Sequence, residues 1–352
     1  MGESMFQPHE TTQQSRTFLA KHVVHRRLPL TSLSFRSFPP LPLSPYLLTL
    51  ATTYDLTTNM ICAPLLSVVL LALGSVSSPI PHKRQAATPA ITDAQILNYA
   101  LTLEYLEENF YAGALAKFDA AAFAADGFPP WVRLRYEQIY AHEQIHVAFI
   151  SSALGSSATK PCNYTFPYTD PRSFVALSKI LEGIGVSAYL GAAASITNKA
   201  YLRAAGAIAS TESRHAAWIS SAVEQGPAWS GPLDVPLDFD QAYSLASQFI
   251  VFCPTSNPAL PVKAFPTLKF SPPAPTPGSK VTVKFNGNSV GNYVVLLTGL
   301  SQIAIPISNQ TITIPANLTG TVYAVVTNSS SMVSDDSTLA GPAVLIFPDP
   351  YV

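Results

Sequence analysis

Two Glu-x-x-His motifs lie far apart in the chain and resemble each other. Glu143 and His146 fall in the segment EQIHVAFISSAL, Glu212 and His215 fall in ESRHAAWISSAV, and seven of the twelve positions are identical. Residues three apart on a helix share one face, so each motif would place a carboxylate beside an imidazole. Iron and manganese accept these ligand types. His142, which precedes the first motif, is given no role.

A second repeat lies N-terminal to each motif. Glu104 is followed seven residues later by Tyr111, and Glu182 is followed seven residues later by Tyr189. The order Glu, Glu-x-x-His, Glu, Glu-x-x-His indicates a duplicated helical hairpin. Each glutamate precedes its predicted turn by about as many residues as the next motif follows it, so a rise of about 1.5 Å per residue brings them to one level. The two tyrosines are interpreted as packing residues.

Four carboxylates inside a bundle would repel one another and lose their hydration. Residues 85–260 contain nine Lys and Arg, of which only Lys179 and Arg214 lie close to a proposed ligand in the sequence. Two divalent ions would resolve this conflict, and carboxylates with one histidine per ion suit iron or manganese. We therefore predict a site for two Fe or Mn ions. Its predicted ligands are Glu104, Glu143, His146, Glu182, Glu212 and His215.

Each ligand also has an interpretation that needs no metal. Glu104 has Glu107 and Glu108 as neighbours, so these residues could form a solvated acidic face. Glu182 could pair with Lys179, three residues before it. The two motif histidines could be ordinary core residues, and the whole site could be vestigial in a fold that is kept as a stable module.

The elements that would position these residues lie within 88–253, which is rich in alanine and has helical periodicity. Thr92-Asp-Ala-Gln95 is a capping box, which predicts a helix to about Phe118. Further helices are predicted from Pro129-Pro130 to Gly155, from Asp170-Pro171 to about Ile196, from about Asn198 to before Gly226-Pro227, and over 240–251. Four long helices with a long middle connection at 155–170 predict a ferritin-like four-helix bundle.

The chain changes character after this region. Eight prolines fall among the 24 residues from Pro254 to Pro277, which predicts a linker at 254–278. In 279–352, short β-branched runs recur at roughly ten-residue spacing between Gly, Asn, Pro and Ser. They predict a small immunoglobulin-like β-sandwich, which we interpret as a structural or adhesive module.

The N-terminal part has the features of a targeting sequence. The apolar run Ile61–Val76 is shorter than the roughly 20 residues of a membrane-spanning helix. We interpret 60–84 as a signal peptide and short pro-segment with a dibasic pair at Lys83-Arg84, and 1–59 as a disordered gene-model extension. A transit peptide and an uncleaved type II anchor remain alternatives. Secretion to the exterior or the cell wall, with no membrane span after processing, is the expectation.

The cysteines and sequons agree with secretion. Cys62 lies in the apolar run, which leaves Cys162 and Cys253 to form a disulfide, with two buried thiols as the alternative. N-x-Ser/Thr sequons predict glycosylation at Asn163, Asn309, Asn317 and Asn328. The 352-residue chain has a net charge of −1, so nucleic acid is not an expected partner.

Taken together, the two Glu-x-x-His motifs and the two preceding glutamates within a repeat resemble the signature of secreted fungal ferritin-like proteins. These are often labelled stress-response proteins and are similar to plant desiccation-related proteins. The resemblance covers about 90–255, and it implies a di-metal carboxylate bundle in a family whose activity is mostly uncharacterised.

Two classes of function follow. The first is a di-metal oxidoreductase or metal-handling protein that reacts with O₂ or peroxide. The second is a metal-free structural or protective protein that binds cell-wall or matrix polysaccharide. Iron storage in a cage is disfavoured, since the proline-rich segment, the glycans and the β-region would obstruct a shell. The sequence specifies neither the substrate, nor the choice of iron or manganese, nor the oligomeric state.

Overall fold

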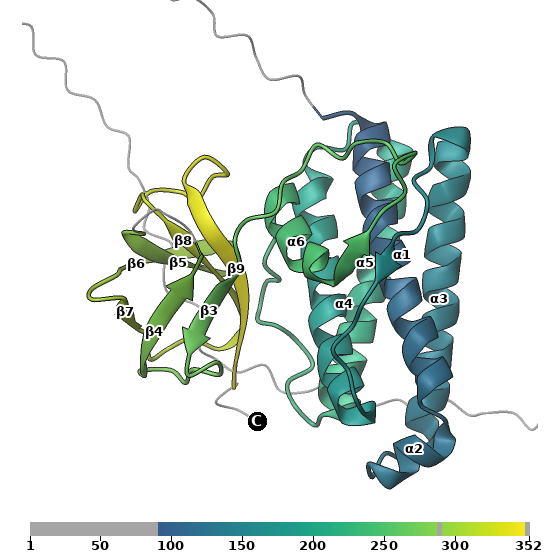
Figure 1. The fold of residues 1–352 in the computed structure, drawn as a ribbon, viewed down its shortest axis with the longest axis horizontal. Coiled ribbons are helices and arrows are strands. Elements are labelled where there is room, and N and C mark those ends of the chain that lie inside the picture. Colours follow the sequence, from purple (N-terminus) through teal and green to yellow (C-terminus); the bar gives the residue numbers. More distant parts are fainter. Residues whose placement is uncertain (1–90, 287–290, 349–352) are drawn as a thin grey trace, which may run out of the picture. The chain divides into compact units, whose positions relative to one another are not determined.

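Four long helices form the middle of the chain in the computed structural model, which describes residues 91–286 and 291–348 (Figure 1). They are α1 (Asp93–Lys117), α3 (Pro130–Leu154), α4 (Pro171–Ala193) and α5 (Lys199–Trp218), the last continuing into a π-helical turn at Ile219–Val223. The predicted extension 1–59 and the predicted signal peptide and pro-segment at 60–84, with Cys62 and Lys83-Arg84, lie outside the described residues.

The helices begin and end where local chemistry requires. At the start of α1, the Thr92 side chain accepts a hydrogen bond from the Gln95 backbone, and the Gln95 side chain accepts one from the Thr92 backbone. Asp170 caps α4 in the same way. The helix α3 stops at Gly155, whose positive φ of 56° is a conformation that favours glycine. These predicted boundaries are confirmed.

Three local features differ from the predictions. A short helix, α2 (Ala120–Ala125), fills part of the predicted first turn and is capped by the Asp119 side chain. The helix α4 ends at Ala193, three residues early. The predicted helix over 240–251 is confined to α6 (Phe239–Ala246) and a 3₁₀ turn, because the β-branched residues that follow form strand β2 (Ile250–Phe252).

The crossover between α3 and α4 is attached to the segment that follows α6, at the C-terminal end of the helical region. Its strand β1 (Asn163–Tyr164) pairs antiparallel with β2. Next to this pair, Cys162 and Cys253 form the disulfide that the sequence predicts. The Asn257 side chain adds hydrogen bonds to the backbone N–H and carbonyl of Lys160. The middle connection is therefore held in place at residues 160–164.

Helix α4 is the most apolar of the long helices. It is the one described helix that is long and apolar enough to cross a membrane by length and composition, and 56% of the relevant window is buried inside the structure. Its apolar character has a structural explanation, because α4 packs against α5, α6 and α1. It also contacts the β-rich region, where the Tyr323 hydroxyl lies 3.0 Å from Ser187 Oγ and donates to the Gly183 carbonyl.

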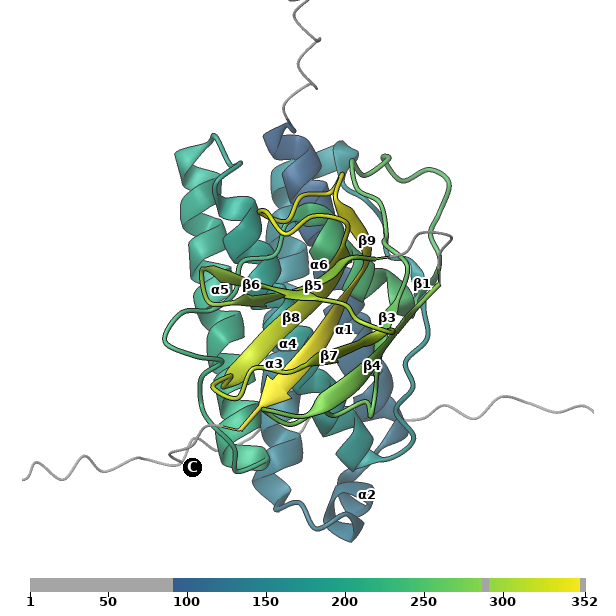
Figure 2. The same cartoon turned by 90° about the vertical axis from the view of Figure 1, so that its left-hand side faces the viewer.

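The C-terminal region forms two antiparallel sheets (Figure 2). One has the order β3-β4-β7, with β3 at Leu268–Ser271, β4 at Lys280–Phe285 and β7 at Thr311–Thr313. The other has the order β6-β5-β8-β9, with β5 at Tyr293–Thr298, β6 at Ser301–Pro306, β8 at Gly320–Thr327 and β9 at Thr338–Phe347. Buried side chains of both sheets share one apolar cluster.

One expectation about this region is not confirmed, and another needs correction. The immunoglobulin-like sandwich is not confirmed, because the sheets are small and open. The β-rich region also begins before the predicted boundary at 279, since β3 lies inside the predicted linker 254–278. Its four residues alternate buried and exposed, and Pro266 and Pro272 flank the strand without interrupting it.

Candidate metal centre

The structure brings all six predicted ligands together inside the bundle. Each long helix contributes: Glu104 comes from α1, Glu143 and His146 from α3, Glu182 from α4, and Glu212 and His215 from α5. The four glutamates are at most 1% exposed, and the two histidines are 8% and 6% exposed. Side chains this polar are rarely buried without partners, so their burial at one place calls for a chemical explanation.

The six residues form two overlapping groups. Glu104 and His146 belong to one, Glu182 and His215 belong to the other, and Glu143 and Glu212 belong to both. Within each group, one ligand atom from every residue lies within 4.8 Å of the others. Each group could hold a metal ion, and two groups that share two carboxylates match the ligand pattern of a di-metal carboxylate site.

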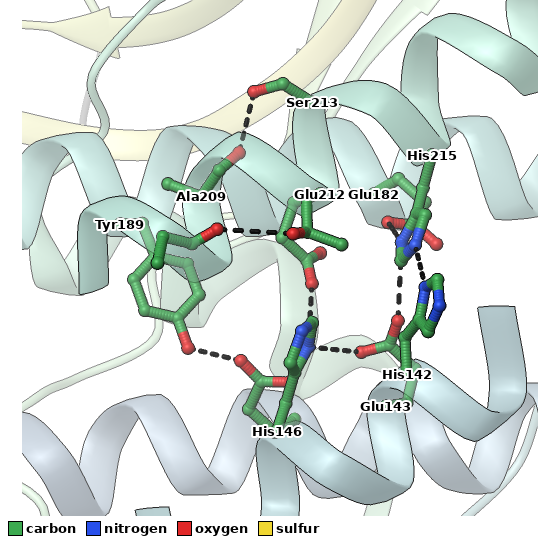
Figure 3. A network of polar contacts seen from close by, with 12 residues as sticks. His142, Glu143, His146, Glu182, Tyr189, Ala209, Glu212, Ser213 and His215 are labelled. Carbon is green, nitrogen blue, oxygen red and sulfur yellow. Dashed lines mark hydrogen bonds and ion pairs between the residues drawn. The ribbon is translucent and has the colours of Figure 1, made fainter. Parts of the chain in front are cut away.

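Both imidazoles direct Nδ1 at the carboxylates (Figure 3). His146 Nδ1 lies 3.2 Å from Glu104 Oε2, 3.1 Å from Glu143 Oε2 and 3.2 Å from Glu212 Oε1. A ring nitrogen carries at most one hydrogen, so it cannot donate to three carboxylates at once. His215 Nδ1 has the same relation to Glu182 Oε2 at 3.2 Å and Glu143 Oε1 at 3.4 Å. Ligand atoms around a shared cation have this converging geometry.

Several carboxylate oxygens in the cluster lack a hydrogen-bond donor. Among the described residues, no hydrogen bond of acceptable geometry reaches Glu104 Oε2, Glu143 Oε1 or either oxygen of Glu212. The proposed neutralisation of Glu182 by Lys179 is wrong, because the Lys179 ammonium pairs with Glu224. Buried oxygens without donors, together with imidazole nitrogens, form a donor set that fits iron or manganese.

Burial and mutual repulsion shift the protonation of the cluster. Burial raises the pKa of Glu182 to about 8, and burial with repulsion from Glu182 raises the pKa of Glu212 to about 8. The pKa of Glu143 is also raised, mainly by burial. Burial lowers the pKa of His215, whereas for His146 the closeness of the Glu104, Glu143 and Glu212 carboxylates outweighs burial and raises the pKa. Without metal, the cluster therefore holds protons at neutral pH.

The two repeated tyrosines do more than pack. The Tyr111 hydroxyl donates to Glu182 Oε1, and the Tyr189 hydroxyl donates to Glu104 Oε1. Each tyrosine thus orients a predicted ligand of the opposite hairpin. The signal for this role was present in the sequence, since a seven-residue step places each tyrosine two helical turns from a ligand on its own helix.

His142 and Glu107 also lie at the site, although neither is among the six predicted ligands. His142 Nδ1 lies 2.9 Å from His215 Nε2, and the two rings stack. Glu107 is only 4% exposed, and burial followed by repulsion from Glu212 raises its pKa. A solvated acidic face is therefore wrong for Glu104 and Glu107, and the signal for Glu107 is its place one helical turn after Glu104.

Comparison with known proteins supports the predicted ferritin-like character of the helical region. The chain is 30% identical over 189 residues to protein rds1 of Schizosaccharomyces pombe. The alignment covers 52% of this chain and 46% of that protein, so the chain spans less than half of its relative. Residues 92–225 match the family described as the ferritin-like domain. This match runs from the α1 cap to just beyond the π-helical turn, and these helices therefore form a ferritin-like domain.

Proposed function

We propose that the ferritin-like domain binds two iron or manganese ions and serves a redox or metal-handling function. The observation that carries this proposal is the pair of overlapping ligand groups, each with three carboxylates and one imidazole within 4.8 Å. The donor-free oxygens of Glu104, Glu143 and Glu212 support it, because each of them needs a cation or a proton as partner.

The residues of the site divide by position. Glu143 and Glu212, common to both groups, would bridge the two positions. Glu104 with His146, and Glu182 with His215, would complete the two ends. An iron or manganese pair held there would supply redox chemistry with O₂ or peroxide.

The protein's own contribution is to hold these ligands before any ion arrives. Tyr111 and Tyr189 orient the two terminal carboxylates, and His142 occupies Nε2 of His215 so that Nδ1 faces the carboxylates. Outer partners of this kind fix the orientation of metal ligands. Because the metal-free cluster holds protons, occupation of the site requires their release.

Elemental analysis of the purified full-length protein tests the proposal, combined with anomalous diffraction at the iron and manganese edges. We expect two ions per chain, one between the ligands of each group. A protein that takes up neither metal, from reduced iron or from manganese salts, would exclude the proposal. It would favour the alternative of a protective or structural protein that binds cell-wall or matrix polysaccharide.

We also propose that the mature protein is secreted and glycosylated. All four predicted acceptor asparagines within the described ranges are exposed: Asn163, Asn309, Asn317 and Asn328. N-terminal sequencing of material from the culture medium should find a start between about residues 77 and 85. Treatment with an N-glycosidase should lower the mass. Retention of residues 1–59 in the extracellular protein, or an unchanged mass, would contradict the respective part.

A further inference from the structure

The two halves of the internal repeat have different residues at one position inside the site. Glu107 lies three residues after Glu104, on the same face of α1. The equivalent position in the second hairpin, three residues after Glu182, is Gly185. The first half of the duplication therefore supplies a carboxylate at this level, and the second half supplies no side chain at all.

Gly185 provides the space into which the Glu107 carboxylate extends. A Cβ atom at Gly185 would lie 2.9 Å from Glu107 Oε1 and 2.9 Å from Glu212 Oε2, closer than a real Cβ approaches such atoms. Glu107 Oε1 and Glu212 Oε2 therefore both face Gly185 on α4. The separation of these two oxygens is at most twice the 2.9 Å that each would have from the Cβ atom. The buried Glu107 carboxylate thus extends toward the side of α4 that Glu212 also faces, and it lies outside the two groups whose ligand atoms are within 4.8 Å of one another.

No cation pairs with Glu107 in the part of the chain that the structure describes. None of the hydrogen bonds found among the described residues involves its carboxylate. It also borders a cavity of about 30 Å³ with a mainly aliphatic and aromatic lining, which includes Leu103, Ile150 and Ile208. Among the described residues of that lining, Glu107 alone is charged. A buried carboxylate with neither a donor nor a cation among the described residues needs a cation, a proton or a water molecule as its partner.

We propose that Glu107 is a seventh ligand side chain of the metal centre, supplied only by the first hairpin. This inference rests on the proposed function. It makes the two ion positions unequal, because no residue of α4 matches Glu107 in the second hairpin. Four carboxylates balance the charge of two divalent ions, so a fifth leaves one negative charge in excess and favours a higher oxidation state of the metal.

The substitution Glu107→Gln tests the proposal, with Glu108→Gln as its control. Glutamine keeps the shape of the side chain and removes its charge, and Glu108 is the adjacent, partly exposed glutamate of the same helix. Metal titration should show that Glu107→Gln weakens binding of one of the two ions tenfold or more. The reduction potential of the metal centre should rise in Glu107→Gln. The control Glu108→Gln should match the wild type in both metal affinity and reduction potential.

Anomalous diffraction of the metal-loaded wild type supplies a second, independent readout. We expect a Glu107 oxygen at a bonding distance of about 2.2 Å from one ion. The inference is overturned if the wild type binds two ions and Glu107→Gln binds them with unchanged affinity, or if the carboxylate points away from both ions. A wild-type protein without metal would overturn the proposed function itself, so the two failures are distinguishable.

Discussion

The hydroxyl of Tyr111 in α1 donates a hydrogen bond to the carboxylate of Glu182 in α4. The relation is reciprocal, because Tyr189 in α4 donates to Glu104 in α1. The duplicated hairpins are therefore joined through the ligands that each would offer to a metal. Orientation of the terminal carboxylates depends on the pairing of the hairpins, and neither hairpin alone contains a complete site.

Removing either hydroxyl should weaken one end of the metal site. We expect Tyr111→Phe to reduce affinity at the position of Glu182 and His215 by about 10- to 100-fold, the usual effect of losing an outer partner of a ligand. Metal titration measures the change. The matched control is Tyr99→Phe, because Tyr99 is equally buried and its hydroxyl has no hydrogen-bond partner among the described residues. Equal effects of the two substitutions would contradict this role.

Each histidine should be required for one ion. We expect His146→Ala to lose the ion at the Glu104 end and His215→Ala to lose the ion at the Glu182 end, since each imidazole belongs to only one ligand group. Metal stoichiometry after dialysis should be one per chain for each single variant and close to zero for the double variant. Gln144→Ala, an exposed neighbour in α3, should keep two. Undiminished metal binding by the double variant would exclude the site.

The metal-free protein should lose stability as pH rises. Burial raises the pKa of Glu182 and Glu212 to about 8, from an ordinary value of 4.5. Their protonation favours the folded state fully below about pH 4.5, and this contribution is lost as pH rises through about 8. His215, with its pKa lowered by burial, acts in the opposite direction, but its contribution is complete above about pH 6.5.

Calorimetry with a chelator present should therefore show a falling unfolding temperature between pH 6.5 and 9. Saturation with metal should remove or reverse this slope, because ions replace the protons on the carboxylates. The variant Glu182→Gln should show a shallower slope without metal. A metal-free unfolding temperature that rises over this range would contradict the predicted protonation of the cluster.

The disulfide should stabilise the domain without contributing to metal binding. Cys162 and Cys253 are 91 residues apart in the sequence, and closing a loop of this length contributes about 4–5 kcal/mol in the chain-entropy model. Replacing both cysteines by serine should lower the free energy of unfolding by up to that amount, as measured by denaturant titration. Metal stoichiometry of the folded variant should stay the same. Loss of metal from a variant that remains folded would show that the crossover also shapes the site.

The sequence alone determined the four long helices and the Glu and His residues that the structure brings together. A capping box at Thr92, a proline at the start of α3 and a glycine at its end are local signals, and the structure obeys them. The six predicted ligands could be identified for a similar reason. Spacing along a helix fixes which side chains share a face, and the duplication repeats the pattern. Short elements such as α2 and β3 were not predictable, because a few alanines or four alternating residues carry little periodic signal.

Only the tertiary structure decided which neighbours complete the site. Glu107 and Glu108 are adjacent and chemically identical in the sequence, yet only Glu107 is directed into the bundle, toward the space left by Gly185. The partner of Tyr111 was equally hidden, because the hydrogen bond joins residues 71 positions apart. Spacing along one helix determines which face a side chain occupies, whereas packing between helices determines what that face meets. The sequence encodes the first directly, and the second follows only from the folded arrangement of all four helices.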